Sequence, residues 1–417
     1  MSSVKKEVAL IGAGKIGKGY IADLFNDAGY KVIFLCHSLR QAKAMREQGY
    51  YTMFKFIEGQ DAPIEYRIEG YEAYSTAAEY EESVAVLARV NYATVHLYPN
   101  AFKDVGNMIG DAIKKRVADG VEETLDVMLC LNFNDADEII MGHIKEVLET
   151  PEQFAYLEKY FGMGMALTFR WGANPRPYML EQDPLCSCVA ESPDLPVDKD
   201  AFKGPIPEGV ALRPLSKMRD RMAYKLWGGN CGGAIVANLA MQRGYTYTYE
   251  GSQELDIYRA SELGLRESHF GFDQVYDLTQ EEKDENHRGR NTGKDNPKRR
   301  REQAKRVDEV TRVGADPARK LARKDRLVGP AIACIKNGKV PFFLAKAAAA
   351  GFYFVNPEDA SACEIQAYLK ENGIEKAIVK YCQLDMEDPH EQLLYQLILA
   401  HYYDMSDLEP EDISYMN

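Results

Sequence analysis

The amino-acid sequence predicts an α/β protein in which an N-terminal doubly wound parallel sheet is followed by a mainly α-helical C-terminal domain. Short apolar strands alternate with helical patterns in the first third of the chain, and this order builds a parallel sheet. A glycine-rich turn follows the first strand, and helical periodicity dominates from about residue 218 onward. At 417 residues the chain exceeds one ordinary core, so more than one domain is expected.

In the first domain, apolar runs mark the strands and capping residues mark the helices between them. The apolar pattern predicts a hairpin over 51–74 and strands at 8–11, 32–36, 84–90, 93–98 and 126–131. Helices are predicted over 15–28, 38–48 and 101–118, and again up to about residue 148. Ser38 suits the N-cap of the second helix, while Gly29 and Gly49 suit the position just after a helix.

The segment 192–214 is rich in proline, glycine and charge, so we place the domain boundary near residue 200. The alternative is that part of this segment adds strands to the first domain. The predicted domains are therefore 1–200 and 201–417. Helices are predicted in the second at 234–242, 253–263, 317–335, 343–350, 360–371 and 391–402. A strongly basic segment, 287–306, is expected to be a solvated loop, with phosphate recruitment as the alternative.

Composition excludes several classes of partner. The 64 acidic residues outnumber the 51 basic ones, which argues against binding to nucleic acid or to an anionic membrane surface. No apolar run approaches the ~20 residues of a membrane span, and the expected compartment is the cytoplasm. The eight cysteines are scattered, so we expect free thiols. Their only close pair, Cys186 and Cys188, lacks partners at metal-ligand spacing, and no metal site is predicted.

The glycine-rich turn lies between a strand and a helix, which is the context in which a GxGxxG pattern indicates dinucleotide binding. The first glycine allows a tight turn, the second lets the backbone approach a pyrophosphate, and the third lets the helix pack on the sheet. The helix N-terminus adds free N–H groups and partial positive charge. This predicts a Rossmann-like domain whose cofactor-binding stretch is Ile11, Gly12, Ala13, Gly14, Lys15, Ile16 and Gly17.

The end of the second strand bears on the choice between NAD and NADP. An acidic residue there would bind the ribose 2′-hydroxyl of NAD, but the chain carries Cys36 followed by His37, Ser38 and Arg40. These donors and this positive charge suit a 2′-phosphate, so the sequence favours NADP, with NAD left open. The alternative is that Ser38 is only a helix cap and Arg40 only a solvated side chain.

Lys225 and Asn230 flank a Gly-Gly pair at the start of the helical half. A buried lysine can serve as a general base because desolvation lowers the pKa of its amine, and an asparagine amide can donate to an alkoxide. Residues five apart on an α-helix lie roughly 140° apart around the axis. The two side chains therefore reach one pocket only if the helix bends or restarts between them. The alternative is a surface lysine beside a capping asparagine.

Several segments, in order along most of the chain, resemble the mannitol-1-phosphate 5-dehydrogenase and mannitol dehydrogenase family, the polyol-specific long-chain dehydrogenases. The segments that carry the resemblance are Gly12–Ile21, Cys130-Leu131-Asn132-Phe133, Lys225–Gly233, Arg312–Leu321, Asp325–Pro330 and, more weakly, Asn372–Ala377.

The resemblance implies hydride transfer, without a metal, between a nicotinamide and a carbon of a polyol, sugar phosphate or related compound. It implies that Lys225 is the general acid/base and that Asn132 and Asn230 hold the alkoxide. It also makes Arg312 and Lys320 candidate substrate contacts; a helix-flanking salt-bridge cluster is the alternative for these two.

The chain departs from the family pattern at two positions that matter for function. Gly233 stands where the family usually has a histidine, and Cys36 where it usually has an acidic residue. The substrate therefore stays open, as do the direction of the reaction and the oligomeric state. A second hypothesis follows, in which the chain is a catalytically impaired dinucleotide-binding sensor or partner protein.

Overall fold

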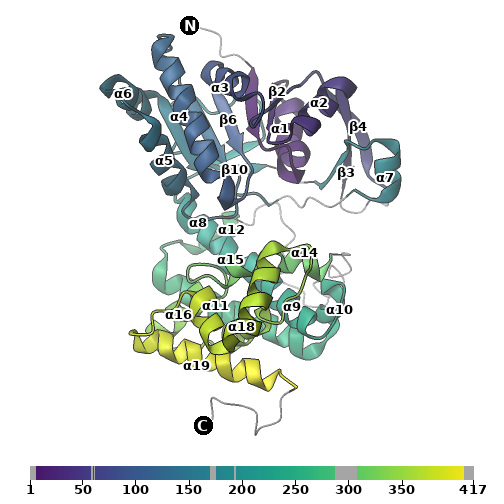
Figure 1. Ribbon diagram of the computed structural model, residues 1–417, viewed down its shortest axis with the longest axis vertical. Helices are drawn as coiled ribbons and strands as arrows, with labels where there is room; N and C mark the ends of the chain where they lie inside the picture. The colour runs from purple at the N-terminus through teal and green to yellow at the C-terminus, as the bar shows by residue number, and fades with distance from the viewer. Residues whose placement is uncertain are drawn as a thin grey trace. The chain divides into compact units, whose positions relative to one another are not determined.

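The computed structural model describes residues 6–57, 60, 62–169, 175–191, 194–286 and 308–407 (Figure 1). The predicted basic segment 287–306 lies outside the described residues. The chain divides into two compact units, Met1–Met222 and Ala223–Asn417, which are described separately. As predicted, the first carries a parallel sheet of Rossmann type and the second is mainly helical.

The first unit is built around a six-stranded sheet in the order β5-β2-β1-β6-β7-β8. Every pairing in it is parallel, and the strand order reverses on either side of β1, as in a doubly wound fold. The strands are β1 (Glu7–Ile11), β2 (Lys31–Cys36), β5 (Glu72–Ser75), β6 (Tyr92–Val95), β7 (Leu125–Leu129) and β8 (Phe161–Met165).

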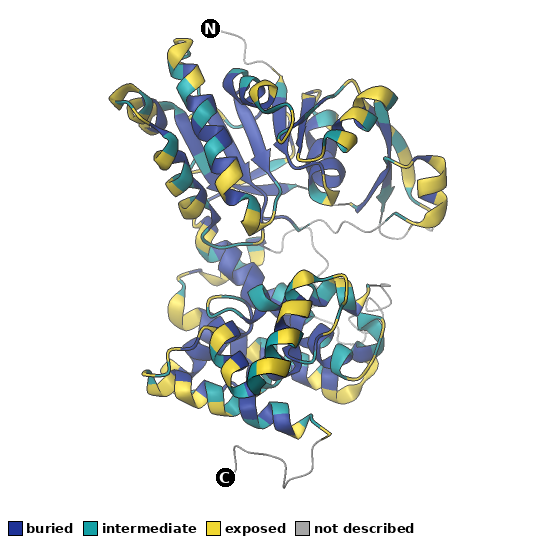
Figure 2. Cartoon of the chain, in the orientation of Figure 1, coloured by how far each residue is buried: buried dark blue, intermediate teal, exposed yellow. Residues whose placement is uncertain are grey.

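Helices cover both faces of this sheet because alternate strand residues point to opposite sides. One face packs on α3 (Tyr80–Arg89), α4 (Phe102–Ala118), α5 (Ala136–Val147) and α6 (Pro151–Tyr160). The other packs on η1 (Lys15–Ile21), α1 (Ala22–Asp27) and α2 (Leu39–Gln48). Figure 2 shows the resulting buried layer along the strands and on the inner sides of the helices. A short 3-10 turn, η2 (Pro99–Ala101), precedes α4.

The predicted strand at 84–90 is wrong, because the structure forms α3 there. The apolar run of Val84, Val86 and Leu87 is short, and such a run cannot distinguish a buried strand from a buried helix. Glu81 and Glu82 stand in the first turn of α3, where they favour a helix N-terminus.

The predicted hairpin over 51–74 is present as an antiparallel pair, with its last part joining the main sheet as β5. The pair belongs to a second sheet with the order β4-β3-β9, and the short helix α7 lies in the chain just before β9. These elements are β3 (Tyr50–Phe56), β4 (Ile64–Glu69), α7 (Pro177–Gln182) and β9 (Ser187–Ala190).

The division between the units falls after Met222, later in the chain than the predicted boundary near residue 200. Two further strands, β10 (Leu195–Asp198) and β11 (Leu212–Leu215), pair with each other, and Leu167 N donates to Pro196 O at 2.9 Å. The carboxylate of buried Asp126, in β7, accepts Lys203 N at 2.7 Å and Gly204 N at 3.0 Å. These bonds tie a segment of linker-like composition to the sheet.

The second unit is a layered bundle whose core is rich in alanine, leucine and isoleucine. Helices α9 (Cys231–Gln242), α16 (Val328–Lys336), α17 (Phe342–Gly351) and α18 (Ala360–Cys382) contribute most of these buried residues. The predicted helix 317–335 is broken in two, α15 and α16, by a turn over 322–327. The helices are α8 (Met218–Lys225), η3 (Leu226–Asn230), α9 (Cys231–Gln242), α10 (Thr248–Gln253), α11 (Leu255–Val275), α12 (Gln280–Asn286), α14 (Val310–Gly314), α15 (Pro317–Leu321), α16 (Val328–Lys336), α17 (Phe342–Gly351), α18 (Ala360–Cys382) and α19 (Pro389–Asp404), of which α8 begins in the first unit.

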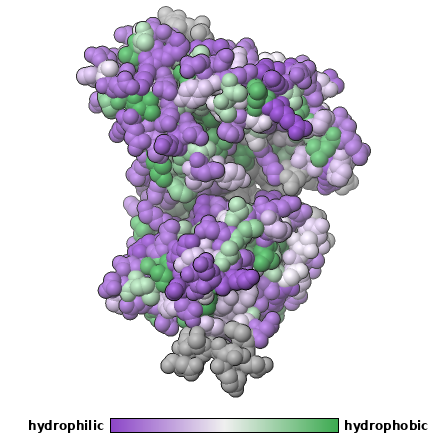
Figure 3. Space-filling view, in the orientation of Figure 1, coloured by the Kyte–Doolittle hydropathy of each residue, from purple (hydrophilic) through white to green (hydrophobic). Residues whose placement is uncertain are grey.

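Hydrophilic residues cover most of the visible face of each unit, with smaller hydrophobic patches between them (Figure 3). Within the described part of the chain, no helix combines the length and the apolar character that crossing a bilayer requires.

Candidate functional site

The glycine-rich turn has the geometry that its three glycines predict. Gly12 adopts φ +104°, a conformation that L side chains rarely take, and a Cβ there would lie 2.8 Å from the His96 carbonyl oxygen. A Cβ on Gly17 would lie 2.1 Å from Gly12 O, so the helix approaches the turn closely only because this residue has no side chain. Gly14 faces open space, with no other atom within 4 Å of where its Cβ would stand.

The helix that opens after this turn begins as a π-helix, η1, rather than as an α-helix. Lys15 is exposed and Ile16 half-buried, whereas Ala13 and Ile11 belong to the buried core at the end of β1. The turn is tight at Gly12, the backbone is accessible at Gly14, and the helix packs closely on the turn at Gly17. These are the three features of a turn that binds a pyrophosphate. The residues present therefore fit a dinucleotide at this edge of the sheet.

At the carboxyl end of β2, Cys36 is fully buried, and burial raises the pKa of its thiol to about 12. His37, Ser38 and Arg40 follow it and are exposed. The Ser38 hydroxyl accepts Gln41 N at 3.3 Å, so Ser38 is the N-cap of α2, as predicted. The Gln41 side chain in turn donates to Ala13 O at 3.0 Å and joins α2 to the glycine-rich turn. Arg40, the positively charged residue beyond β2, thus lies on α2, the helix that is hydrogen-bonded to the glycine-rich turn.

Asn132 is exposed three residues beyond the end of β7. Since β1, β6 and β7 are adjacent and parallel, their carboxyl ends share one edge of the sheet. Asn132 therefore lies along the same edge as Gly12, where open α/β sheets bind ligands.

Lys225 and Asn230 lie at the two ends of a π-helical turn, η3, that joins α8 to α9. Within it, Gly228 has φ −95° and ψ −108°, which is not helical, so the helix restarts at this residue. Because the turn is interrupted at Gly228, the separation of roughly 140° that an uninterrupted α-helix would impose on Lys225 and Asn230 does not apply. The break that the sequence required between the two side chains is present. Lys225 is buried, with 6% of its surface exposed, and Asn230 is half-buried.

Helix α11 holds this turn in place from one side. The Ser268 hydroxyl donates to the Trp227 carbonyl at 2.6 Å, and the His269 ring stacks on Tyr224 with the ring centroids 5.7 Å apart. A Cβ on Gly228 would lie 3.6 Å from His269 Nε2, so this imidazole borders the turn. Neither Ser268 nor His269 stands out in the sequence, because both lie about 40 residues away and join the turn only through tertiary packing.

The two predicted substrate residues have different surroundings. Arg312, in α14, is exposed and makes a bidentate ion pair with Asp308, one helical turn earlier, which matches its salt-bridge alternative. Lys320, in α15, is buried, and its amine donates to Val313 O at 2.5 Å. A Cβ on Gly233 would lie 3.7 Å from Val313 Cγ1, so Val313 links Lys320 to the beginning of α9.

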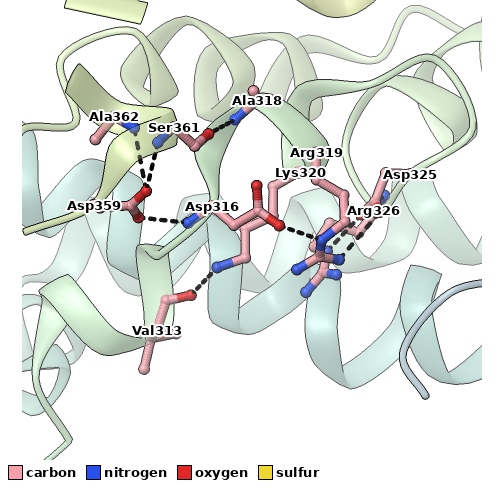
Figure 4. A network of polar contacts seen from close by, with 10 residues as sticks. All are labelled: Val313, Asp316, Ala318, Arg319, Lys320, Asp325, Arg326, Asp359, Ser361 and Ala362. Atoms are coloured by element: carbon pink, nitrogen blue, oxygen red, sulfur yellow. Dashed lines mark hydrogen bonds and ion pairs between the residues drawn. The ribbon is translucent and has the colours of Figure 1, made fainter. Parts of the chain in front are cut away.

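Lys320 stands in a buried polar network shown in Figure 4. Burial, together with the charges of Arg326 and Arg319, lowers the pKa of its amine well below the usual value. Arg319 pairs with Asp316 and Arg326 with Asp325. Asp316, at the N-cap of α15, is held in the left-handed region at φ +60° while its N–H donates to Asp359.

We expect Lys320→Met to raise the melting temperature at neutral pH, because the removal of a buried amine beside two guanidinium groups outweighs the lost hydrogen bond to Val313 O. Since the pKa of Lys320 is lower in the folded chain than in the unfolded chain, the unfolded chain binds more protons at pH values between the lowered folded-state pKa and ~10.5. The stability of the wild type should therefore rise with pH towards that value. Thermal melts of both proteins from pH 7 to 10 should converge, and a constant difference would contradict the expected titration.

Within the ranges that the structure describes, no group of three or more histidine, cysteine, aspartate or glutamate side chains is placed to hold a metal ion. The cysteines are all free thiols.

Comparison with known proteins agrees with the fold class. The sequence model of the mannitol dehydrogenase Rossmann domain matches residues 6–167. Mannitol-1-phosphate 5-dehydrogenase of Anoxybacillus flavithermus is 26% identical over 396 residues, covering 92% of this chain and 98% of that protein. The enzyme of the same name from Bacillus subtilis is 27% identical over 380 residues, covering 91% of this chain and 95% of its own.

The fold has a solved counterpart in Pseudomonas fluorescens mannitol 2-dehydrogenase, whose ternary complex with NAD and D-mannitol superposes with a TM-score of 0.75. The two chains are 12% identical, and the match covers 97% of this chain and 93% of that one. Fold and relatives together define a dehydrogenase that acts on a CH–OH group. These matches confirm the resemblance to the mannitol-1-phosphate 5-dehydrogenases and mannitol dehydrogenases that was found in the sequence.

Proposed function

We propose that the chain is a metal-independent NAD(P)-dependent oxidoreductase that transfers a hydride between nicotinamide and a polyol, sugar phosphate or related hydroxy compound. The observation that carries this proposal is the π-helical turn that interrupts the helix between buried Lys225 and half-buried Asn230. The first unit is proposed to bind the dinucleotide and the second to supply the lysine. The names of the sequence relatives favour a phosphorylated polyol, and mannitol 1-phosphate is the first substrate to test.

In this proposal Lys225 takes the proton of the substrate hydroxyl during oxidation and returns it during reduction. The nicotinamide supplies the hydride acceptor or donor when it is bound. The Asn230 amide donates to the oxygen on which negative charge develops, a role for which an oriented side-chain amide is well suited. Asn132, at the carboxyl edge of the first unit's sheet, is proposed for the same role. Lys320 and Arg312 are proposed to contact the substrate.

The cofactor is proposed to be NAD or NADP, with NADP favoured. The position at the end of β2 holds a buried cysteine, Cys36, so there is no carboxylate there to bind the ribose hydroxyl of NAD. His37 and Arg40, which follow it, are exposed. Arg40 also stands in the first turn of α2, the helix whose Gln41 is bonded to the glycine-rich turn.

We expect Arg40→Ala to weaken NADPH binding by about 10–100-fold and to leave NADH binding within about twofold, because a charged hydrogen bond to the 2′-phosphate is lost. Fluorescence titration of both reduced cofactors measures the two dissociation constants. Lys43→Ala is the matched control, because it removes the same charge from the same helix at an exposed position. Equal losses for both cofactors would show that Arg40 does not select NADP.

The experiment that tests the function as a whole is a screen of polyols, ketoses and their phosphates with both cofactors. Turnover on any of these substrates supports the proposal and eliminates the sensor hypothesis, in which the dinucleotide binds without chemistry. Binding of a cofactor with no turnover across the screen would favour the sensor. Failure to bind either cofactor would contradict both.

A further inference from the structure

A histidine at the carboxyl end of β6 is bonded to the glycine-rich turn. His96 is the first residue beyond the strand, and its backbone N–H donates to Ile11 O at 3.0 Å. Its Nδ1 lies 3.1 Å from Gly12 O, and its Nε2 lies 2.8 Å from the hydroxyl of Thr94, a fully buried strand residue. The imidazole therefore joins β6 to the turn through both of its ring nitrogens.

These partners fix the tautomer of the ring. A backbone carbonyl oxygen can only accept, so Nδ1 carries the hydrogen that is donated to Gly12. Nε2 is then the acceptor for the Thr94 hydroxyl. Burial lowers the pKa of His96 to about 4, opposed by the backbone carbonyls of Gly12 and Ile11. The ring thus stays neutral at physiological pH and keeps one acceptor and one donor.

The hydrogen bond from His96 Nδ1 is accepted by Gly12, the residue whose conformation determines the shape of the turn. Gly12 is at φ +104°, and glycine can leave this conformation readily because it has few steric restrictions. A Cβ on Gly17 would lie 3.0 Å from His96 Nδ1 as well as 2.1 Å from Gly12 O. The imidazole therefore packs where the glycines leave room, and it bonds to the Gly12 carbonyl, while the Gly12 N–H donates to Leu35 O at 2.9 Å.

We propose that His96 is a positioning residue that holds the glycine-rich turn in its dinucleotide-binding shape through the bond from Nδ1 to Gly12 O. The inference rests on the proposed cofactor binding at this turn. It assigns His96 no contact with the cofactor and no part in proton transfer. Because His96 holds the Gly12 peptide in place before the dinucleotide binds, less conformational entropy is lost on binding and the affinity is higher.

The proposal predicts a separation between cofactor affinity and catalytic rate. In His96→Leu, the dissociation constant and the KM for the cofactor should rise about tenfold, which corresponds to one lost hydrogen bond. The kcat at saturating cofactor should stay within about twofold. His96→Asn should recover most of the affinity, since its amide can donate to Gly12 O from nearly the same place. A side chain that only filled space would be replaced better by leucine than by asparagine.

Cofactor titration and thermal melts of these two variants provide the test, with His143→Asn as control, because this changes the same residue type on α5 of the same unit. If His96→Leu folds and binds the cofactor as tightly as wild type, the inference is overturned. If it does not fold, Thr94→Val decides, because removing the donor to Nε2 should loosen the ring and weaken binding about threefold. Wild-type affinity in Thr94→Val would then overturn the inference.

A spectroscopic measurement tests the tautomer independently of binding. Imidazole ¹⁵N shifts of wild type should show protonated Nδ1 and unprotonated Nε2 at neutral pH, and the opposite tautomer would overturn the inference. Failure of the wild type to bind either cofactor contradicts the proposed function instead. The two failures are thus distinguishable.

Discussion

Lys225→Ala is expected to lower kcat by about 10³-fold in both directions of the reaction while cofactor affinity stays within about twofold of wild type. General acid–base catalysis by a positioned side chain contributes about 10²–10⁴-fold, and the substitution removes the only group proposed to move the proton. The Lys225 side chain is buried at the junction of α8 with the π-helical turn. We therefore expect that a lysine on the protein surface does not take over its proton transfer. Steady-state kinetics together with cofactor titration measure both quantities.

Two further variants make this result specific. Lys376→Ala removes an exposed lysine from α18 in the second unit and should leave kcat within about twofold of wild type. Lys225→Arg keeps a positive charge, yet its guanidinium does not release a proton at neutral pH, so it should be nearly as inactive as the alanine variant. Full activity of either Lys225 variant on the true substrate would show that Lys225 is not the acid/base.

The parts of the fold that could be predicted from the sequence are those in which a local pattern has one structural solution. The sequence predicted strand β1 before Gly12, and it predicted both ends of helix α2, from Ser38 at the N-cap and Gly49 after the last turn. Each of these signals lies within a few residues of the element that it marks. The run 84–90 was assigned wrongly because its length fits both a buried strand and a helix. The linker-like segment after residue 190 is tied to the sheet by Asp126, a partner about 75 residues away that composition cannot reveal.

The same limit applies to the candidate site. The sequence marked Lys225 and Asn230, and it required a break at the glycine pair, but it could not supply the π-helical turn that makes the break. Nor could it find His269, Ser268 and Val313, which reach the turn and Lys320 from other helices. His96 gave no signal either, because its role depends on the close approach of β6 to the glycine-rich turn.

Substitution of Asn230 is expected to have the second large effect on kcat, and Asn238 in α9 provides a matched control. We expect Asn230→Ala to lower kcat by about 10²–10³-fold, the usual cost of removing one donor to a developing oxyanion, with little change in substrate KM. Its melting temperature should change little, since the residue is half-buried at the N-cap of α9 and makes no side-chain capping bond. Kinetics and thermal melts of the same preparation measure both.

Asn238, two turns further along α9, is buried, and its amide donates to Ala347 O at 3.0 Å in α17. Asn238→Ala removes this hydrogen bond between α9 and α17 and leaves a space in the core, so it should cost about 1–3 kcal/mol of stability while kcat is retained. The two asparagines thus separate a role in chemistry from a role in packing within one helix. If both variants lost stability and rate together, the π-helical turn would be a structural junction only, and the alkoxide would need a different donor.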